Sequence, residues 1–232
     1  MGRWEDTMNG TKQGQDLWPT NVRYLAECVW DDDIPDGIRR MLSGHVSTAK
    51  RALIGDRLLR STWSKLVRIE KITDAHHPAC GQFGLFATKT LEPNSFILPY
   101  VGRVHRNERS DPLSDYDIGW CENLSIDAQT CGNEARMIND FRNTGMKVNA
   151  LFDDYKDPQS GQTVLGVWTG PRLINRGSEI LVSYGKAYWK ARGLLRDEWA
   201  DYVEDSVAQD RDTDTTKPDT TPLSAVPKTG LS

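Results

Sequence analysis

The side chains that could bind a ligand or take part in chemistry gather in four segments in the middle of the chain. The segments cover residues 81–97, 99–104, 125–140 and 174–189. They combine glycine turns with tyrosine, asparagine, aspartate and arginine, whose hydroxyl, amide, carboxylate and guanidinium groups can hydrogen-bond a ligand. Taken alone, any one of them is an ordinary turn or β-hairpin, so their meaning depends on their order along the chain.

Metal and nucleotide sites find little support in the sequence. The four cysteines are Cys28, Cys80, Cys121 and Cys131. They contain no CxxC pair, and a disulfide framework or a structural zinc site would need closer clustering. The adjacent His76 and His77 lack helical ligand spacing and precede Pro78, which predicts a polar loop. Neither GxGxxG nor GxxxxGKS/T occurs, so the usual phosphate-binding loops are absent.

The four segments carry motifs in a definite order and spacing. They are Gly84-Leu85-Phe86-Ala87, Tyr100-Val101-Gly102, Ile126-Asp127-Ala128 followed by Gly132-Asn133, Ala135-Arg136 and Ile138-Asn139, and finally Gly177-Ser178-Glu179-Ile180 with Tyr184-Gly185. Asn149 stands between the last two groups, and Gly102 within a strand predicts a bulge or a close backbone approach. In this order they resemble the SET domain of protein lysine methyltransferases, over about residues 67–190.

The resemblance implies a mainly β fold with short helices, in which small sheets surround a pseudoknot. A C-terminal strand of the family passes through a loop, so the Asn139 and Tyr184 segments are expected to cross. Short runs of β-type sequence occur at 67–72, 95–104, 124–128, 148–152, 164–168 and 179–184. Such runs between turn residues agree with this fold. Alternating βαβ units are absent, which disfavours a doubly wound nucleotide-binding sheet.

The family uses S-adenosyl-L-methionine, and the resemblance implies a bent cofactor on one face of the domain. The positions that match its cofactor-binding residues are Gly84, Leu85, Phe86, Arg136, Asn139, Asp140 and Tyr184. Trp189 has two interpretations of equal weight, because it either stacks on the adenine or packs the final helix. No metal ion is expected.

Methyl transfer from a sulfonium to an amine is an in-line displacement, which needs alignment and a neutral amine. A free lysine is charged at neutral pH, with a pKa of about 10.4, and a narrow aromatic channel lowers that pKa by desolvation. The resemblance implies that Tyr184 and Tyr100 are the catalytic tyrosines, with Tyr184 orienting the amine. The expected channel residues are Tyr100, Phe152, Val182 and Tyr184. Phe152 is equally suited to core packing.

The chain departs from the family pattern beside these residues. Residues 139–142 read Asn-Asp-Phe-Arg where members usually have Asn-His-Ser-Cys. Asp140 therefore adds a carboxylate near a cationic ligand, where it either assists binding or is merely solvated. Ser183 replaces a common aspartate, and Val182 stands where many members carry a Phe or Tyr that controls the number of methyl groups. No cysteine follows Cys131, which rules out the zinc cluster that follows the core in many members.

The elements before the motifs are expected to be helical. The first part, 1–65, is expected to be a helical N-terminal extension, and the residues before Trp18 are a candidate disordered start. Apolar residues spaced by three and four support the helix: Ile38, Leu42, Val46, Ala49 and Leu53. Asp36 could cap its start.

The SET domain itself is expected at 66–190, with two further parts behind it. A C-terminal helix over 186–203 is expected to close the lysine channel. The last part, 205–232, is rich in Thr, Asp, Ser and Pro and contains no aromatic residue. It is expected to be a disordered tail, because it cannot bury enough apolar area to offset the entropy of ordering.

Composition and charge limit the partners. The net charge of −4 disfavours nucleic-acid binding by bulk basic charge and suits a basic protein segment as substrate. The sequence has no secretory signal and no run of about 18 apolar residues, so an intracellular protein without a membrane span is expected, with the nucleus favoured over the cytoplasm by the resemblance. The leading function is a protein-lysine N-methyltransferase acting on a histone tail. The alternatives are a non-histone protein substrate and a catalytically inactive SET-fold binding module.

Overall fold

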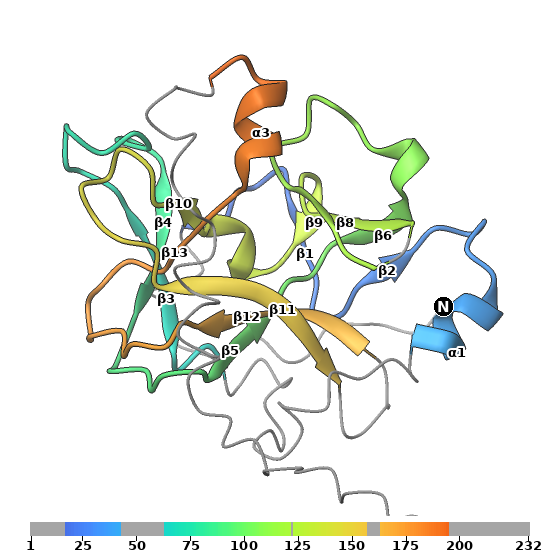
Figure 1. Cartoon of the computed structure of the whole chain (residues 1–232), viewed down its shortest axis with the longest axis horizontal. Coiled ribbons are helices and arrows are strands. Elements are labelled where there is room, and N and C mark those ends of the chain that lie inside the picture. The colour runs from blue at the N-terminus through green and yellow to red at the C-terminus, as the bar shows by residue number, and fades with distance from the viewer. Residues whose placement is uncertain (1–16, 43–62, 122, 157–162, 195–232) are drawn as a thin grey trace, which may run out of the picture.

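The computed structural model describes residues 17–42, 63–121, 123–156 and 163–194 (Figure 1). These residues form short strands in five small sheets, with only short helices between them. The mainly β fold with short helices that the sequence predicted is confirmed. The expected tail at 205–232 lies outside the described residues.

One of these sheets has three antiparallel strands. Its strands are β5 (Phe96–Pro99), β11 (Ala150–Lys156) and β12 (Thr163–Thr169), in the order β11-β12-β5. A small cluster forms on this sheet, where the Phe96 ring packs against Tyr155 and Trp168 at centroid distances of 4.5 and 5.4 Å. A Cβ added at Gly166 would lie 2.7 Å from the Phe96 ring, so the glycine leaves room for this ring on the strand.

A four-stranded sheet holds the second predicted glycine motif. Its strands are β2 (Val29–Trp30), β6 (Arg103–Arg106), β8 (Leu124–Asp127) and β7 (Asp117–Gly119), in that order, and the 3₁₀ helix η2 (Asn107–Arg109) follows β6. The run at 95–104 is therefore two strands, β5 and β6, with a break between them. A Cβ at Gly102 would lie 2.4 Å from the carbonyl oxygen of Asp127. The close backbone approach predicted at Gly102 is confirmed, and it explains why the chain bends there.

The described part of the N-terminal region is not wholly helical. The helix α1 (Asp36–Leu42) begins at Asp36, and its Leu42 is buried in the main core. Before it, β1 (Arg23–Tyr24) pairs with β9 (Cys131–Gly132), and β2 pairs with β6. Prolines and a run of three aspartates at 31–33 keep this stretch from continuing a helix. These residues therefore belong to the sheets of the domain, and the predicted helical positions beyond Leu42 lie outside the described residues.

The remaining short strands connect the motifs. The hairpin of β3 (Val67–Lys71) and β4 (Phe83–Ala87) is antiparallel. The 3₁₀ helix η3 (Glu134–Met137) leads into β10 (Asn139–Asp140), which pairs in parallel with β13 (Leu181–Val182). This pairing brings the Asn139 segment beside the segment that leads to Tyr184, as the sequence predicted. Of the run at 179–184, only β13 is a regular strand.

The C-terminal helix is shorter than predicted. Helix α3 (Lys186–Ala191) ends well before 203, because Gly193 adopts a φ of 65°. The N–H of Gly193 then bonds to the carbonyl of Lys190, and the N–H of Leu194 to that of Trp189, which is a common way to terminate a helix. The expectation of one helix over 186–203 is thus wrong at Gly193, and residues from 195 onward lie outside the description.

Most of the sheets share one main core. Its largest fully buried side chains include Trp63, Leu85, Ile126 and Ile180. Within the part of the chain that the structure describes, no helix is both long and apolar enough to cross a membrane.

Candidate active site

A cavity of about 510 Å³ lies between segments that are far apart in the sequence. One wall is the loop at 77–83, another comes from 136–142, and a third from 184–189. Pro19, Asp115 and Tyr116 complete the lining. The volume lies in the range of about 300 to 1,000 Å³ that small-molecule sites occupy.

Five of the predicted cofactor-binding residues line this cavity. They are Arg136, Asn139, Asp140, Tyr184 and Trp189. Arg136 connects two parts of the lining, because its Nε donates to the carbonyl of Ala128 at 2.9 Å and its guanidinium lies 4.0 Å above the ring of Tyr116. The structure therefore brings together residues that are up to 53 positions apart in the sequence.

The glycine-rich segment reaches the cavity at earlier positions than the sequence predicted. Residues 81–83 line the cavity, whereas 84–86 do not. Once β4 forms at Phe83, the chain turns into the hairpin, and Leu85 is fully buried in the main core. The space over Gly84 is filled by the side chain of Glu179. Of this segment, residues 81–83 therefore form the cavity lining, and a role of Gly84, Leu85 and Phe86 in cofactor binding stays a prediction.

Tyr184 lies where the cavity meets the main core. Its ring packs partly against the core and also lines the cavity. Its phenol donates a hydrogen bond of 2.6 Å to the carbonyl oxygen of Ile138, and its backbone N–H donates one of 2.7 Å to Asp140 Oδ2. Both acceptors lie at β10, so the pairing of β10 with β13 fixes the direction of the phenol.

Three phenols of the site stay neutral at physiological pH. Burial raises the pKa of Tyr184 above its usual value, and the phenol of Tyr188 adds to the shift. Burial is also the main reason why the pKa of Tyr100 is raised, with Tyr184 as the next contribution. Burial, followed by the nearby Asp115 carboxylate, raises the pKa of Tyr188 to about 12. These side chains therefore act as hydrogen-bonding groups and not as bases.

Alkaline pH is expected to destabilise the fold through Tyr100 and Tyr184. A phenol whose pKa is raised on folding contributes its full stability below its unfolded pKa of about 10, and loses that contribution as the pH rises toward the folded value. The free energy of unfolding should therefore fall above about pH 10, by up to about 1.4 kcal/mol per pH unit for each phenol. Urea unfolding between pH 8 and about pH 11 measures this slope. Tyr184→Phe should make it shallower, and an unchanged slope would contradict the assignment.

The other predicted channel residues lie on the core side of Tyr184. The buried Tyr100 ring meets Phe152 edge-on at a centroid distance of 5.4 Å, and its hydroxyl donates to the carbonyl of Tyr116 at 2.7 Å. Val182 is fully buried on β13, which lies against β11, the strand of Phe152. These three residues, Tyr100, Phe152 and Val182, are the channel cluster. None of them lines the cavity, so Tyr184 alone of the four predicted channel residues touches it.

The Asp140 carboxylate is neither solvated nor unpaired. Its side chain is 5% exposed and lies 2.8 Å from Nη1 of Arg142, whose side chain is 2% exposed. Its Oδ2 also accepts hydrogen bonds from the N–H of Tyr184 and, at 3.3 Å, from Nε1 of Trp189. Arg142 therefore balances the negative charge of Asp140, which the sequence had suggested could assist the binding of a cationic ligand. The carboxylate oxygens hold the C-terminal aromatic side chains in place.

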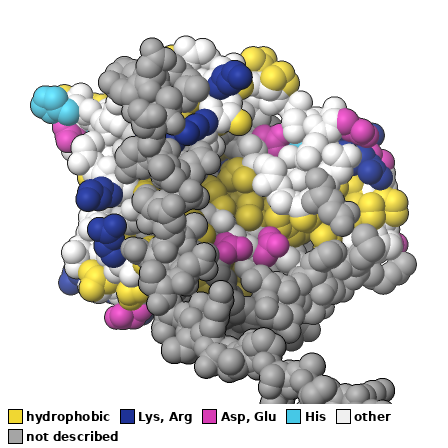
Figure 2. Space-filling view, viewed as in Figure 1, with side chains coloured by type: hydrophobic (Ala, Val, Ile, Leu, Met, Phe, Trp, Pro, Cys, Tyr) yellow, Lys and Arg dark blue, Asp and Glu magenta, His cyan; other side chains and the backbone are white. Residues whose placement is uncertain are grey.

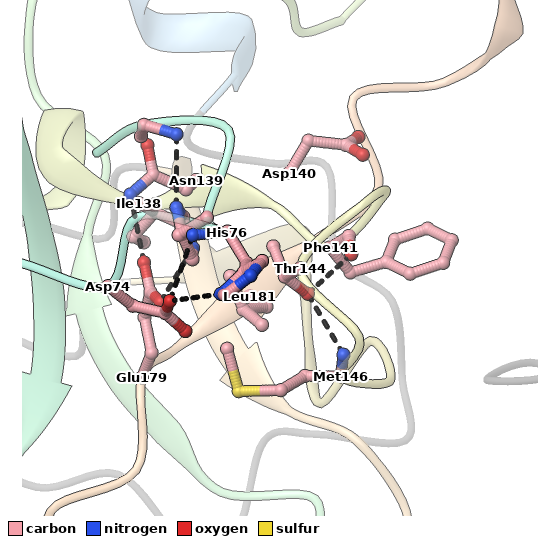
Figure 3. A network of polar contacts seen from close by, with 12 residues as sticks. Asp74, His76, Ile138, Asn139, Asp140, Phe141, Thr144, Met146, Glu179 and Leu181 are labelled. Atoms are coloured by element: carbon pink, nitrogen blue, oxygen red, sulfur yellow. Dashed lines mark hydrogen bonds and ion pairs between the residues drawn. The ribbon is translucent and has the colours of Figure 1, made fainter. Parts of the chain in front are cut away.

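Asn139 points to the other side of β10. Figure 3 shows the side chain of Asn139 directed toward Glu179 and that of Asp140 directed away from it, as alternation along a strand requires. The Asn139 Nδ2 donates to Glu179 Oε1 at 2.8 Å and to the carbonyl of Phe83 at 3.1 Å. Asn149 fixes the segment that leads into β13, because its Nδ2 donates to the carbonyl of Glu179 and its Oδ1 accepts from the N–H of Leu181.

Gly84→Ala is expected to destabilise the protein by about 1 to 3 kcal/mol. The added Cβ would lie 2.6 Å from Glu179 Oε1 and 2.9 Å from the Phe86 ring, so the buried carboxylate would have to move. Urea unfolding measures the loss. Gly119→Ala is the matched control, since a Cβ on that β7 glycine meets nothing within 4 Å. Equal stability of the two variants would contradict the close contact.

Helix α3 is fastened to the segment before β7. Arg192 Nη2 lies 2.6 Å from Asp115 Oδ1, and the Tyr188 hydroxyl donates to the same oxygen at 3.1 Å. The Arg192 guanidinium also lies over the Tyr188 ring at 3.7 Å. In this position Trp189 faces Tyr184 with nearly parallel rings, 17° apart. The helix thus closes one side of the cavity.

Residues 82–185 match the family model described as the SET domain. This part of the chain is a SET domain. A human relative, histone-lysine N-methyltransferase EHMT1, is 25% identical over 119 residues, which make up 49% of this chain and 9% of that protein. The chain therefore corresponds to only a small part of that relative.

Solved structures that resemble part of the chain include those of polycomb repressive complex 2. The complex of Chaetomium thermophilum matches with a TM-score of 0.40 and 23% identity, covering 52% of this chain and 15% of that chain. A humanized mutant of that complex, bound to an inhibitor, matches with a TM-score of 0.42 and 23% identity, over 53% of this chain and 15% of that chain.

Among the residues described for the present protein, no group of three or more His, Cys, Asp or Glu could hold a metal ion.

Three departures of this SET domain from the family pattern contact one another. Arg142, at the usual cysteine position, pairs with Asp140, at the usual histidine position. The same Nη1 donates to Oγ of Ser183 at 3.3 Å, where a common aspartate is replaced. A carboxylate is thus present at 140 and absent at 183, and one buried arginine joins both positions. The substitutions form a single unit.

Sequence reasoning missed several residues of the site. Asp115 and Tyr116 line the cavity, and no local sequence pattern distinguished them. His77 lines the cavity, although its sequence context predicted a polar loop. Tyr188 and Arg192 were assigned to a helix by their spacing, and that spacing does place them on one side of α3, facing Asp115.

Proposed function

We propose that this protein is an S-adenosylmethionine-dependent protein-lysine N-methyltransferase. The observation that carries the proposal is the position of Tyr184, which touches both the cavity and the core that contains the channel cluster. A methyl donor on the cavity side and a lysine on the cluster side would then meet at this phenol. Methyl transfer in line requires such a meeting point, since the reacting atoms must be held about 3 Å apart and aligned.

The hydrogen bond of Tyr184 determines what its oxygen can offer. The phenol uses its proton on the carbonyl of Ile138, so its lone pairs remain as acceptors. An amine N–H that donates to this oxygen would have its own lone pair directed away from the phenol, toward the cavity. Because burial raises the pKa of Tyr184, the phenol orients the amine without removing its proton as a base.

Two features of the channel cluster favour a neutral lysine. Tyr100 and Val182 are buried, and the Phe152 ring packs against Tyr100. An ammonium group that enters such surroundings loses its hydration, which lowers its pKa. The proton then leaves to solvent before transfer, and the amine keeps its alignment with Tyr184.

The cavity suits the cofactor in size and in lining. When bound, S-adenosylmethionine supplies a methyl group activated by a positively charged sulfur. Aromatic faces attract such a cation, and the lining includes Phe83, Tyr116, Tyr184, Tyr188 and Trp189. Trp189 is held by Asp140 through its indole N–H and lines the cavity wall beside Tyr184, which makes it a candidate to stack on an adenine.

The substrate we favour is a basic, lysine-containing segment such as a histone tail. Figure 2 shows hydrophobic side chains at the centre of one face, with acidic side chains close beside them. Two aspartates, Asp153 and Asp154, follow Phe152 on β11, and Asp154 accepts a hydrogen bond from the indole of Trp120 at 3.0 Å. Such a surface favours a cationic peptide electrostatically, in a protein expected in the nucleus.

Radiolabelled methyl transfer tests the proposal directly. The full chain is mixed with labelled S-adenosylmethionine and either intact histones, histones without tails, or a cell lysate. Labelling of intact but not of tailless histones would support the histone substrate, and labelling of other proteins alone would favour a non-histone substrate. No transfer to any protein, together with no cofactor binding by calorimetry, would overturn the proposal.

One observation favours a second candidate, a SET-fold binding module without catalysis. Arg142 lines the cavity, and a cation there weakens the binding of a positively charged sulfonium. Its pairing with Asp140 offsets this repulsion, which is why we prefer the enzyme. Cofactor binding without turnover would support the module, and any turnover abolished by Tyr184→Phe would eliminate it.

A further inference from the structure

Two adjacent histidines have opposite surroundings. The His76 side chain is 98% exposed and its Nδ1 lies 3.2 Å from Asp74. The His77 side chain is 5% exposed, and the residue lines the cavity. A polar loop explains the first histidine but not the burial of the second, which the mechanism above does not use.

Both ring nitrogens of His77 face a partner. The backbone N–H of Ala79 donates to its Nδ1 at 3.0 Å. A nitrogen that accepts a hydrogen bond carries no proton, so the proton of the neutral ring is on Nε2. That Nε2 lies 3.1 Å from Glu179 Oε2. The hydrogen bond from Ala79 orients the ring at its Nδ1 end, and the Nε2 end lies in close contact with the Glu179 carboxylate without hydrogen-bond geometry.

Glu179 connects His77 to the predicted cofactor site. Its side chain is 3% exposed, and a buried carboxylate is costly unless polar groups satisfy it. Its second oxygen accepts from Asn139 Nδ2 at 2.8 Å. A Cβ added at Gly84 would lie 2.6 Å from that oxygen, so the glycine leaves room for the carboxylate. His77 and Asn139 thus hold the carboxylate from two sides.

The same contacts hold both ends of the cavity loop, 77–83. His77 is fixed through Glu179, and the carbonyl of Phe83 is held by Asn139 Nδ2 at 3.1 Å. Between these ends, the N–H of Gln82 donates to the carbonyl of Ala79 within the loop. The N–H of Gly81 donates to the carbonyl of Ile72, which precedes the loop. Removing the imidazole would weaken the His77 end of this wall to its backbone hydrogen bonds with Asp74 and Cys80, while leaving the Phe83 end attached.

We propose that His77 is a positioning residue, which acts through Glu179 on Asn139 to hold the cavity loop in the shape that binds S-adenosylmethionine. The role rests on the proposed function for its ligand. The contacts from His77 through Glu179 to Asn139, which we call the loop latch, are made by the protein alone. His77 then affects binding of the cofactor and not of the protein substrate, because its contacts lie on the cavity side of Tyr184.

The experiment compares His77→Ala, His77→Gln and His76→Ala in the full chain. His77→Ala should weaken S-adenosylmethionine binding about tenfold, measured as Kd by calorimetry, and raise the KM for the cofactor without changing the KM for the protein substrate. His77→Gln, whose amide can still reach Glu179, should recover most of the affinity. His76→Ala is the matched control and should bind as the unaltered protein does.

A second measurement separates failure of the latch from failure of the proposed function. Hydrogen exchange of the cofactor-free protein should show faster exchange at the Gly81 and Gln82 amides in His77→Ala than in His76→Ala. If His77→Ala does not fold, Glu179→Gln, which keeps the shape of the side chain, takes its place with the same expectations. Unchanged exchange and cofactor affinity would overturn the latch. Faster exchange in a protein that binds no S-adenosylmethionine would uphold the loop latch and overturn both its role in cofactor binding and the proposed function.

Discussion

Tyr184→Phe is expected to lower methyl transfer by on the order of a hundredfold, with the fold retained. The substitution removes the oxygen that bonds to Ile138 at 2.6 Å and keeps the ring that packs on the core. Without that oxygen an incoming amine has no acceptor to orient it. The loss should therefore fall on kcat, since the ring and the backbone N–H to Asp140 still define the cavity wall.

Steady-state kinetics with labelled cofactor measures this effect. Tyr24→Phe is the matched control, because it also removes a hydrogen-bonded phenol. The Tyr24 hydroxyl donates to Glu134 over 3.0 Å, and neither residue lines the cavity. That control should keep its kcat. A Tyr184→Phe protein with unchanged kcat would contradict the role of the phenol, and thermal unfolding of both variants shows whether the fold is intact.

Arg142→Met is expected to reduce the free energy of unfolding by about 3 to 5 kcal/mol and to abolish most activity. The change leaves the Asp140 carboxylate buried, with its side chain 5% exposed and no cation beside it. Water would then have to enter, and the carboxylate would turn from the N–H groups of Tyr184 and Trp189. The site therefore loses its arrangement together with its stability.

A double-mutant cycle measures the coupling in this pair. Asp140→Asn combined with Arg142→Met removes both charges and should cost less than the sum of the single changes, because neither leaves an unbalanced charge. Urea unfolding gives the four free energies. Arg172→Met removes an exposed arginine and serves as control, with a change of less than about 0.5 kcal/mol. Additive losses would show that Asp140 and Arg142 do not act together.

Local patterns predicted the strands that lie between turns. The runs at 67–72, 124–128 and 164–168 correspond to β3, β8 and β12, because alternation and β-branched residues act over a few positions. The predicted helix over 186–203 is interrupted after Ala191, because Gly193 adopts a φ of 65°. A glycine's conformation depends on its surroundings, which spacing alone does not contain.

The sequence by itself determined the family, the order of its motifs, and the nearness of Asn139 to the Tyr184 segment. These follow from short stretches whose residue types and spacing are required together. It could not separate His76 from His77, since adjacent residues of one type share every local signal.

Only the tertiary structure decided which histidine is buried, that residues 81–83 and not 84–86 form the cavity wall, and that Asp140 meets Arg142 and Ser183. Burial and ion pairing depend on groups brought together by folding from distant parts of the chain. Asp140 and Ser183 are 43 positions apart, and the parallel pairing of β10 with β13 places them beside the same guanidinium. The sequence shows which side chains carry a charge, whereas the fold determines which neighbour balances that charge.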